Sequence, residues 1–213
     1  MSCKHITIPY DFYKEYVREN PLFQERMNQR IVYVRAKHQL KGQEEDAFIQ
    51  EYFVEVFSWT VLSYPLLLEM DALLSSHVPN YTLVDPCSGN SFHTFLFRHF
   101  CDRSVMTVDI QPDEVPWTPT IEADGIAYVQ RLASHQNLVL FLSWVDFTDR
   151  DIVYQLLTSF HGKIVVSVGN YRNETSQKYL ERLRDAYQLL ATYFCVMPWG
   201  LTEEIRIFKI ITE

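Results

Sequence analysis

The sequence has 213 residues, of which 47% are hydrophobic and 22% charged, a composition typical of a globular chain long enough to bury a full core. The net charge of −8 argues against sequence-independent nucleic-acid binding through a broad basic face. The N-terminus has no apolar signal-peptide region, and the most apolar segment, Thr60–Leu68, is too short to span a membrane.

Residues 9–78 show the apolar spacing of amphipathic helices. Pro21 separates the first two helices, and Pro65 is placed to open the last, because proline fits the first turn of a helix. The third and fourth helices are expected over Glu44–Ser63 and Leu66–Ser76.

From residue 80 the pattern changes to apolar runs that alternate with amphipathic segments. The expected strands are Tyr81–Val84, Val105–Val108, Ile121–Glu122, Leu138–Leu142, Lys163–Val168, Ala191–Met197 and Ile205–Ile211. The expected helices are Ser91–Phe100, Gly125–Ala133, Asp149–Phe160 and Ser176–Leu190.

This alternation predicts an α/β fold, a Rossmann-like three-layer sandwich. Leu138–Leu142 lacks polar alternation, as expected for a strand covered by helices on both faces. Only Pro198–Glu204 separates the last two strands, too few residues for a crossover, so they should pair antiparallel. We expect about seven strands, mostly parallel, with one antiparallel strand near the C-terminus. Residues 80–213 would form this domain, and residues 1–79 a helical extension that packs on or caps it.

Candidate site residues follow the strands, because ligands of open α/β sheets bind beyond the carboxyl ends of strands where the strand order reverses. The segment Leu83–Phe92 reads L-V-D-P-C-S-G-N-S-F and contains a single glycine, Gly89. Asp109 ends the next strand about twenty residues later, the separation at which an acidic group meets a ribose diol in such folds. The residues at the four strand ends are Asp85, Asp109, Asp124 and Ser143-Trp144. Each acid alone could instead cap a turn or a helix, but their shared rim favours a binding site.

The order of these motifs resembles the class I S-adenosylmethionine-dependent methyltransferases, as a divergent member, over roughly residues 66–213. The acidic-x-Gly-x-Gly pattern of that family is reduced here to Asp85 with Gly89. One glycine suits this cofactor, which has no phosphate to be surrounded by backbone N–H groups. Ser143–Phe147 stands in the place of the family's fourth motif but lacks the (Asp/Asn/Ser)-Pro-Pro-aromatic form typical of amino-group methylation.

The resemblance implies S-adenosylmethionine as cofactor and an unidentified methyl acceptor as substrate. Asp85 and Gly89 would lie near the methionine portion, Asp109 would bind the ribose, and Ile110 would pack on the adenine. Asp124 would hydrogen-bond the adenine amine. The full implied cofactor set is Asp85, Pro86, Cys87, Gly89, Asn90, Asp109, Ile110, Asp124, Gly125 and Ser143. The implied catalytic set is Ser143, Trp144 and Asp146.

The implied reaction is a direct displacement at the sulfonium methyl carbon, in which the protein mainly aligns the nucleophile. A base is needed only if the acceptor arrives protonated, and Asp146, His93 and Asp85 are candidates for it. The alternative function is a catalytically inactive methyltransferase-like scaffold or partner-binding protein, which the reduced glycine motif and Asn170 permit. A nicotinamide-dependent oxidoreductase fits less well, because its pyrophosphate needs closer glycines.

Metal binding and cysteine chemistry are weaker readings. His93 and His99 are six residues apart and would point to different sides of a helix. Cys87 has no evident histidine partner that would make it a nucleophile. The four cysteines include no CxxC pair, so we expect reduced thiols and a cytoplasmic location.

The acceptor is left open by the sequence, as is the oligomeric state. The aromatic residues before the first strand could line an acceptor pocket, although packing of the helices onto the sheet is the simpler reading; they are Phe53, Phe57, Trp59 and Tyr64. A basic run could touch an acidic partner, although interleaved acids favour a solvated face; it comprises Arg26, Arg30, Arg35, Lys37 and Lys41.

Overall fold

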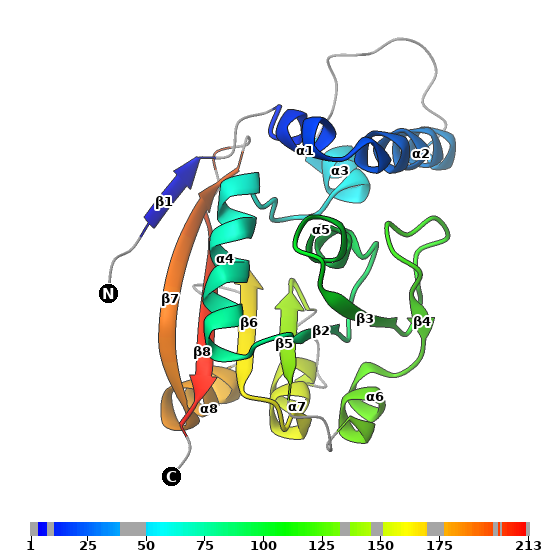
Figure 1. The fold of residues 1–213 in the computed structure, drawn as a ribbon. Helices are drawn as coiled ribbons and strands as arrows, with labels where there is room; N and C mark the ends of the chain where they lie inside the picture. Colours follow the sequence, from blue (N-terminus) through cyan, green and yellow to red (C-terminus); the bar gives the residue numbers. More distant parts are fainter. Residues whose placement is uncertain are drawn as a thin grey trace.

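The computed structural model describes residues 4–7, 11–38, 50–132, 137–145, 151–169, 177–197, 200 and 202–211 (Figure 1). The strands are β1 (Lys4–Thr7), β2 (Thr82–Asp85), β3 (Ser104–Asp109), β4 (Ile121–Glu122), β5 (Leu138–Ser143), β6 (Ile164–Gly169), β7 (Tyr187–Val196) and β8 (Thr202–Ile210). The helices are α1 (Tyr13–Glu19), α2 (Pro21–Lys37), α3 (Gln50–Val56), α4 (Tyr64–His77), α5 (Phe92–Phe100), α6 (Gly125–Arg131), α7 (Ile152–Ser159) and α8 (Gln177–Ala186).

The strands form one eight-stranded sheet in the order β1-β7-β8-β6-β5-β2-β3-β4. β8 runs antiparallel to both of its neighbours, β6 and β7, and every other pair is parallel. The expected mostly parallel sheet with one reversed strand near the C-terminus is therefore confirmed. The chain order reverses at β2, since β3 and β4 extend the sheet to one side and β5 and β6 to the other.

Both faces of the sheet are covered, which explains the uninterrupted apolar strands. In β5, Val139 and Phe141 belong to one buried cluster, whereas Leu138, Leu140 and Leu142 belong to the other. The first cluster includes side chains of α4 and α5, and the second includes side chains of α6, α7 and α8. Alternate side chains of one strand thus enter opposite layers, as strand geometry requires.

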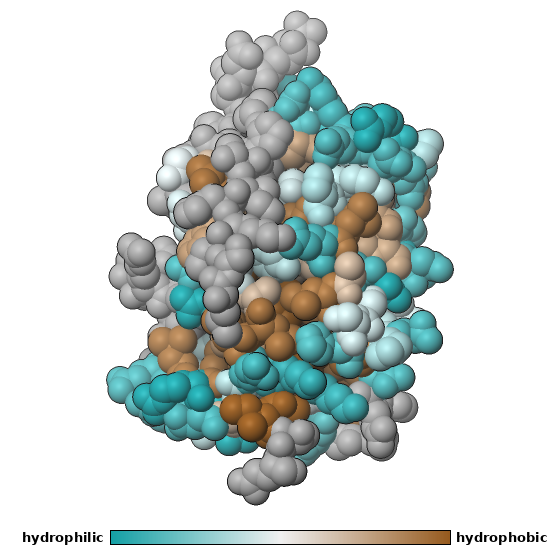
Figure 2. Space-filling model, turned by 60° about the vertical axis from the view of Figure 1, so that its left-hand side comes forward, coloured by the Kyte–Doolittle hydropathy of each residue, from teal (hydrophilic) through white to brown (hydrophobic). Residues whose placement is uncertain are grey.

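Strand β1 was not expected, and it extends the sheet from seven strands to eight. Its four residues pair in parallel with Tyr193–Val196 of β7. A segment this short carries almost no periodic signal, so its strand conformation comes from pairing with β7 and not from its own sequence. Figure 2 turns this side of the molecule forward and shows apolar side chains between polar ones on it.

Two helices end four or more residues before the expected positions. α3 ends at Val56, not Ser63, because backbone carbonyls in residues 57–63 accept hydrogen bonds from distant side chains instead of from the next turn. α8 ends at Ala186, not Leu190, because Tyr187–Leu189 pair with β8. In both places tertiary contacts override local helical preference.

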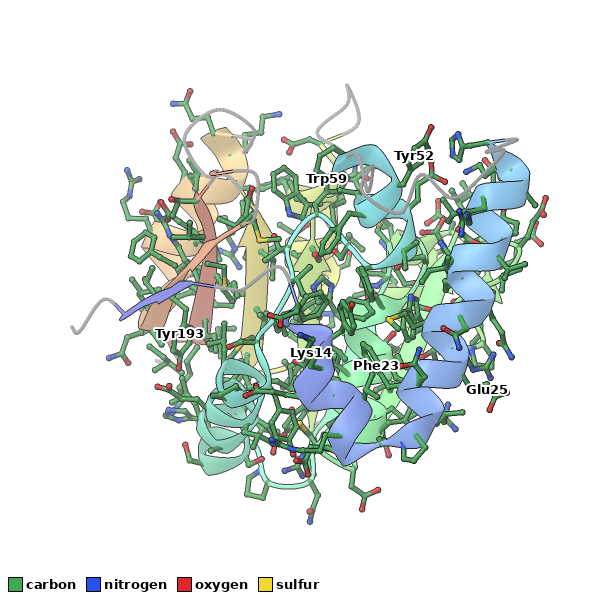
Figure 3. The ribbon with its side chains drawn as sticks, turned by 90° about the horizontal axis from the view of Figure 1, so that it is seen from above. Lys14, Phe23, Glu25, Tyr52, Trp59 and Tyr193 are labelled. Atoms are coloured by element: carbon green, nitrogen blue, oxygen red, sulfur yellow. The ribbon has the colours of Figure 1, made fainter. Side chains whose placement is uncertain are left out.

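Helices α1, α2 and α3 lie over the edge of the sheet at which β5 and β6 end (Figure 1). Pro21 occupies the first turn of α2, and the Asn20 side chain caps it by accepting a hydrogen bond from Leu22 N (3.0 Å). The rings of Tyr16 and Phe23 stack 5.2 Å apart and join these helices to the buried cluster under α4 and α5. In the view from above, Phe23 of α2 points toward the middle of the molecule and Glu25 of the same helix points outward, whereas Tyr52 and Trp59 lie near α3 (Figure 3).

Candidate functional site

The loop after β2 forms the floor of the candidate site, at the point where the strand order reverses. Asp85 ends β2 and is buried. Burial, and then the nearby charge of Asp109, raise the pKa of Asp85 to about 8, which a hydrogen bond from the backbone N–H of Cys87 only partly offsets. At neutral pH the Asp85 side chain is therefore mainly a neutral carboxylic acid.

Asp109 ties this loop to the end of β3. Its Oδ2 accepts a hydrogen bond from Gly89 N (2.8 Å), and its Oδ1 accepts one from Gln111 N (2.9 Å). Gly89 has φ +52, a left-handed conformation that glycine adopts without strain, and nothing lies within 4 Å of where a Cβ would stand. Each carboxylate oxygen keeps a further lone pair and can accept another hydrogen bond.

Asn90 has a structural role that sequence reasoning missed. Its side-chain amide donates to the carbonyls of Glu55 (3.1 Å) and Phe57 (2.7 Å), and its Oδ1 accepts from Phe92 N (3.1 Å). The amide thus fastens the loop to the end of α3. No spacing in the sequence points to this contact, because its partners are backbone atoms more than thirty positions away.

Asp124 and Gly125 begin α6 on the β4 side of the site. Asp124 Oδ1 caps the helix by accepting from Ala127 N (2.8 Å), which is the capping role left open by the sequence. A Cβ on Gly125 would lie 2.2 Å from the carbonyl oxygen of Pro86, so this glycine lets α6 approach the loop. Ile110 lies beside Asp109 with 68% of its surface exposed.

Ser143 and Trp144 end β5 at the same rim. Trp144 has φ +50, a conformation that bulky residues rarely adopt. Its indole Nε1 donates to Thr60 Oγ1 (2.7 Å), and its backbone N donates to Val168 O (3.1 Å). Asp146, the third expected catalytic residue, lies outside the described residues, as does Asn170.

His93, a buried residue of α5, bonds to the same threonine, Thr60. Its Nε2 donates to Thr60 O (2.7 Å), and its ring lies 5.2 Å from that of Phe141. Burial lowers the pKa of His93 to about 4, although the hydrogen bond to Thr60 opposes this. The imidazole is therefore neutral near pH 7. His93 and Trp144 together fix the loop that carries Thr60.

Some of these residues border one cavity of about 320 Å³, in the range of small-molecule sites. The described lining comes from the β2 loop, the start of α5, the end of β5, the segment after β3, and the N-terminal helices with the loop after α3; it consists of Lys37, Val54, Glu55, Ser58, Trp59, Asp85, Cys87, Ser88, Gly89, Asn90, Phe92, His93, Asp113, Ser143 and Trp144. This described lining does not include Asp109, Ile110, Asp124 or Gly125. Burial, followed by the charge of Asp85, raises the pKa of Cys87 to about 12, so this thiol is not a reactive thiolate.

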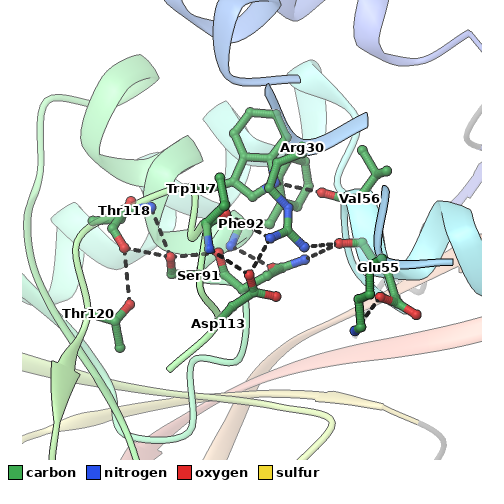
Figure 4. Close-up of polar contacts among 12 residues, drawn as sticks. Arg30, Glu55, Val56, Ser91, Phe92, Asp113, Trp117, Thr118 and Thr120 are labelled. Carbon is green, nitrogen blue, oxygen red and sulfur yellow. Dashed lines mark hydrogen bonds and ion pairs between the residues drawn. The ribbon is translucent and has the colours of Figure 1, made fainter. Parts of the chain in front are cut away.

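Arg30 holds the N-terminal helices to the site, contrary to the expectation of a solvated basic face. Only 1% of its surface is exposed. Its guanidinium pairs with Asp113 Oδ1 (2.5 Å) and donates to Val115 O (2.7 Å) and to Glu55 O. Figure 4 shows these contacts next to Trp117, whose Nε1 donates to Val56 O (2.6 Å). Charges interleaved along α2 gave no sign that one arginine points inward.

The other expected aromatic residues mostly pack. Phe53 and Phe57 are buried in the cluster that also contains Tyr16 and Phe23, and the Tyr64 ring contacts Tyr16 at 5.5 Å. The remaining one, Trp59, lines the cavity and is 44% exposed.

Within the described part of the chain, no group of three or more histidine, cysteine or acidic side chains is arranged to hold a metal ion. Over the same residues, every helix falls short of the length and apolar character needed to cross a bilayer. Cys87, Cys101 and Cys195 are free thiols.

Neither a protein-family model nor a curated protein sequence matches the chain. Solved structures do match. One is a protein of Listeria monocytogenes proposed to be a class I S-adenosylmethionine-dependent methyltransferase, with 9% identity, a TM-score of 0.52, and coverage of 89% of this chain and 68% of that chain. The fold is that of the class I S-adenosylmethionine-dependent methyltransferases.

Two further solved structures match the chain. An uncharacterized protein of Listeria monocytogenes serotype 4b has 10% identity and a TM-score of 0.50, covering 72% of this chain and 70% of that chain. The 1,6-didemethyltoxoflavin-N1-methyltransferase of Burkholderia thailandensis, solved with S-adenosylhomocysteine, has 13% identity and a TM-score of 0.47, covering 68% of this chain and 78% of that chain. At these identities the likeness concerns the fold alone.

Proposed function

We propose that this protein is an S-adenosylmethionine-dependent methyltransferase. The observation that carries the proposal is the Asp109 carboxylate, which joins Gly89 N to Gln111 N beside the exposed side chain of Ile110. A carboxylate and an apolar side chain thus stand together at the rim where the strand order reverses, as a ribose with an attached flat base requires.

The residues present fit this cofactor. The Oγ of Ser88 is buried without a hydrogen-bond partner among the described residues, and it lies in the loop that lines the cavity. The open space above Gly89 leaves room for a chain to pass close to the backbone. A buried polar atom without a partner and a path along the loop both favour a ligand at this place.

Each residue then has a proposed role. Asp85, Ser88 and Gly89 face the methionine portion, with Pro86, Cys87 and Asn90 shaping the loop around them. Asp109 binds the ribose hydroxyls, and Ile110 packs on the adenine. Asp124 keeps Oδ2 for the adenine amine while Oδ1 caps α6, and Gly125 keeps the helix close enough for this contact.

The bound cofactor would supply an activated methyl group on a sulfonium leaving group. The chain would exclude water and align the acceptor between Ser143 and Trp144 at the end of β5, and such alignment accounts for most of the catalysis that this displacement needs. His93 is a poor base near pH 7, because its pKa lies at about 4 and its Nε2–H is bonded to Thr60. An acceptor that arrives without a proton to lose suits this site.

Isothermal titration with S-adenosylhomocysteine tests the proposal. We expect a micromolar Kd for the wild type, a value typical of cofactors. Asp109→Ala should abolish binding while the protein stays folded. Ile110→Lys should weaken binding about tenfold or more, since it removes the apolar contact with the adenine and puts a charge in its place.

The matched control is Val32→Lys on α2, which is 69% exposed, as Ile110 is 68% exposed. This change should leave the Kd unaltered. A folded wild-type protein that binds neither S-adenosylhomocysteine nor S-adenosylmethionine would overturn the proposal and leave the scaffold function in its place.

A further inference from the structure

Two indole rings lie next to each other in the lining of the cavity, one from the N-terminal helical part and one from the sheet domain. Trp144 stands at the end of β5, and Trp59 comes from the loop after α3. Their ring centroids lie 5.7 Å apart with the planes tilted by 38°. Both rings line the cavity next to each other, so they form one aromatic part of its wall, the Trp59–Trp144 surface.

This aromatic surface is held in place. Trp144 keeps its left-handed backbone conformation because its backbone N bonds to Val168 O and its Nε1 bonds to Thr60 Oγ1. Thr60 is itself buried and is fixed through its carbonyl by His93. Such a strained conformation persists where the surrounding structure holds it, and it occurs mainly at functional sites. Trp59 nevertheless keeps 44% of its surface exposed.

The described lining offers an anionic acceptor no unpaired cation. Of the three carboxyl groups that line the cavity, those of Glu55 and Asp113 are paired with Lys37 and Arg30, and that of Asp85 is mainly neutral near pH 7. Lys37 is the cation among the described lining residues, and its Nζ is already paired with Glu55 Oε2 at 2.7 Å. Ser58 and Ser143 place hydroxyl groups in the same lining, where they can meet the polar edge of a ring.

We propose that the Trp59–Trp144 surface binds a flat aromatic or heteroaromatic small molecule as the methyl acceptor. The proposal rests on the proposed function, since it places the acceptor beside the loop assigned to the cofactor. Aromatic faces recognise flat rings by offset stacking, and a ring nitrogen or ring substituent could then face Ser143. A heteroaromatic nitrogen with a free lone pair would form the N–CH₃ bond while the methyl–sulfur bond breaks, S-adenosylhomocysteine leaves as a neutral thioether and the positive charge passes to the ring. No proton is lost, so no base is needed, in keeping with the weak basicity of His93.

Fluorine NMR of protein labelled with 5-fluorotryptophan tests the proposal. The chain has four tryptophans, and Trp59→Phe and Trp144→Phe variants assign the two relevant resonances. Quinoline is the probe, in the presence of saturating S-adenosylhomocysteine, and decahydroquinoline is its saturated, non-flat and cationic counterpart. We expect quinoline to shift the Trp59 and Trp144 resonances saturably, with buried Trp117 unchanged, and decahydroquinoline to shift neither.

Trp59→Leu should weaken quinoline binding about fivefold or more, because one half of the stacking surface is lost. Leu68→Ala, a change at an exposed apolar residue of α4, should not weaken it. Both variants should keep the wild-type Kd for S-adenosylhomocysteine. This last titration separates the two proposals: if the wild type binds no S-adenosylhomocysteine, the proposed function fails, whereas intact cofactor binding without a quinoline response refutes only the acceptor class.

Equal or stronger shifts with decahydroquinoline would also overturn the inference and assign the aromatic surface to cationic amines, through cation–π attraction.

Discussion

Asp85 is the residue whose chemistry depends most on its surroundings. It is buried at the end of β2 and stands near a second carboxylate, Asp109, and both conditions favour its neutral form. A cationic amino group arriving at the loop would reverse this preference. Cofactor binding below pH 8 should therefore be accompanied by release of a proton from Asp85.

The raised pKa of Asp85 also makes stability depend on pH. Its folded-state pKa of about 8 lies above the ordinary value of 3.8, so its contribution to stability is complete below about pH 4 and is lost as the pH rises through 8. Asp85→Asn removes this loss. One pKa unit corresponds to about 1.4 kcal/mol, so the variant should gain about a few kcal/mol in free energy of unfolding relative to wild type between pH 5 and pH 9.

Urea unfolding at several pH values measures this difference. Asp102→Asn, at an exposed aspartate, is the control and should show a constant difference from wild type. If the difference in free energy of unfolding between Asp85→Asn and wild type did not change with pH, Asp85 would be ionised in the folded protein.

At the scale of elements, two glycines position the β2 loop for different reasons. Gly89 supplies a left-handed backbone with open space around it, whereas Gly125 lets the first turn of α6 touch Pro86. The first is a requirement of conformation and the second a requirement of room. Only Gly125 involves two elements, since a side chain at this position would push α6 away from the β2 loop.

Gly125→Ala should therefore destabilise the protein more than Gly89→Ala. Alanine in place of glycine near the start of a helix ordinarily stabilises it by about 0.5–1 kcal/mol, but the new Cβ would lie 2.2 Å from Pro86 O. We expect a loss of about 2–3 kcal/mol for Gly125→Ala, as for overpacked sites, and about 1–2 kcal/mol for Gly89→Ala, from strain alone. Urea unfolding of both variants measures the order, and the reverse order would contradict the contact between α6 and the loop.

Periodicity was sufficient to predict the order of elements from residue 80 onward. Continuous apolar runs such as Leu138–Leu142 indicated a sheet covered on both faces, and the short connection after β7 indicated the reversed strand β8. Of the residues expected at the strand ends, Asp85, Ser143 and Trp144 border one cavity. Strand β1 was not predicted, because four residues carry too little periodic pattern and its partner β7 lies almost two hundred positions away.

The inner contacts of the site could not be predicted in this way. The Asn90 amide, the Thr60 carbonyl and hydroxyl, and the Arg30 guanidinium all act on partners that are distant in sequence, and most of those partners are backbone atoms. Backbone groups are the same at every position, so no residue pattern reveals which of them will be bound.

For the whole molecule, the connection between the N-terminal helices and the sheet is polar at its centre and aromatic around it. The Arg30 guanidinium bonds to α3 and to the segment after β3. The centroid of the Trp117 ring lies 5.1 Å from that of Phe23 on α2 and 5.0 Å from that of Phe92 on α5. The helices that border the acceptor side are thus fixed to the segment that follows Asp109.

Arg30→Met tests this connection. It removes the charged donor from Asp113 and from the carbonyls of Val115 and Glu55. Removing one partner of a buried ion pair costs about 3–5 kcal/mol. Arg26→Met is the matched control on the same helix, because the described partner of Arg26 is Gln29 at 3.4 Å, and it should change stability by about 0.5 kcal/mol or less. Urea unfolding followed by tryptophan fluorescence measures both; similar losses for the two variants would show that Arg30 contributes little to holding the helices.

The added strand β1 has a consequence for self-association. An open sheet presents unpaired N–H and C=O groups along its outermost strands, which can recruit a strand from another molecule. Here the two outermost strands are β1, with four residues, and β4, with two. The part of β7 that β1 does not pair with contains a register shift between Leu189 and Ala191, which interrupts a regular pairing edge. Both margins of the sheet are thereby made poor templates for edge-to-edge aggregation.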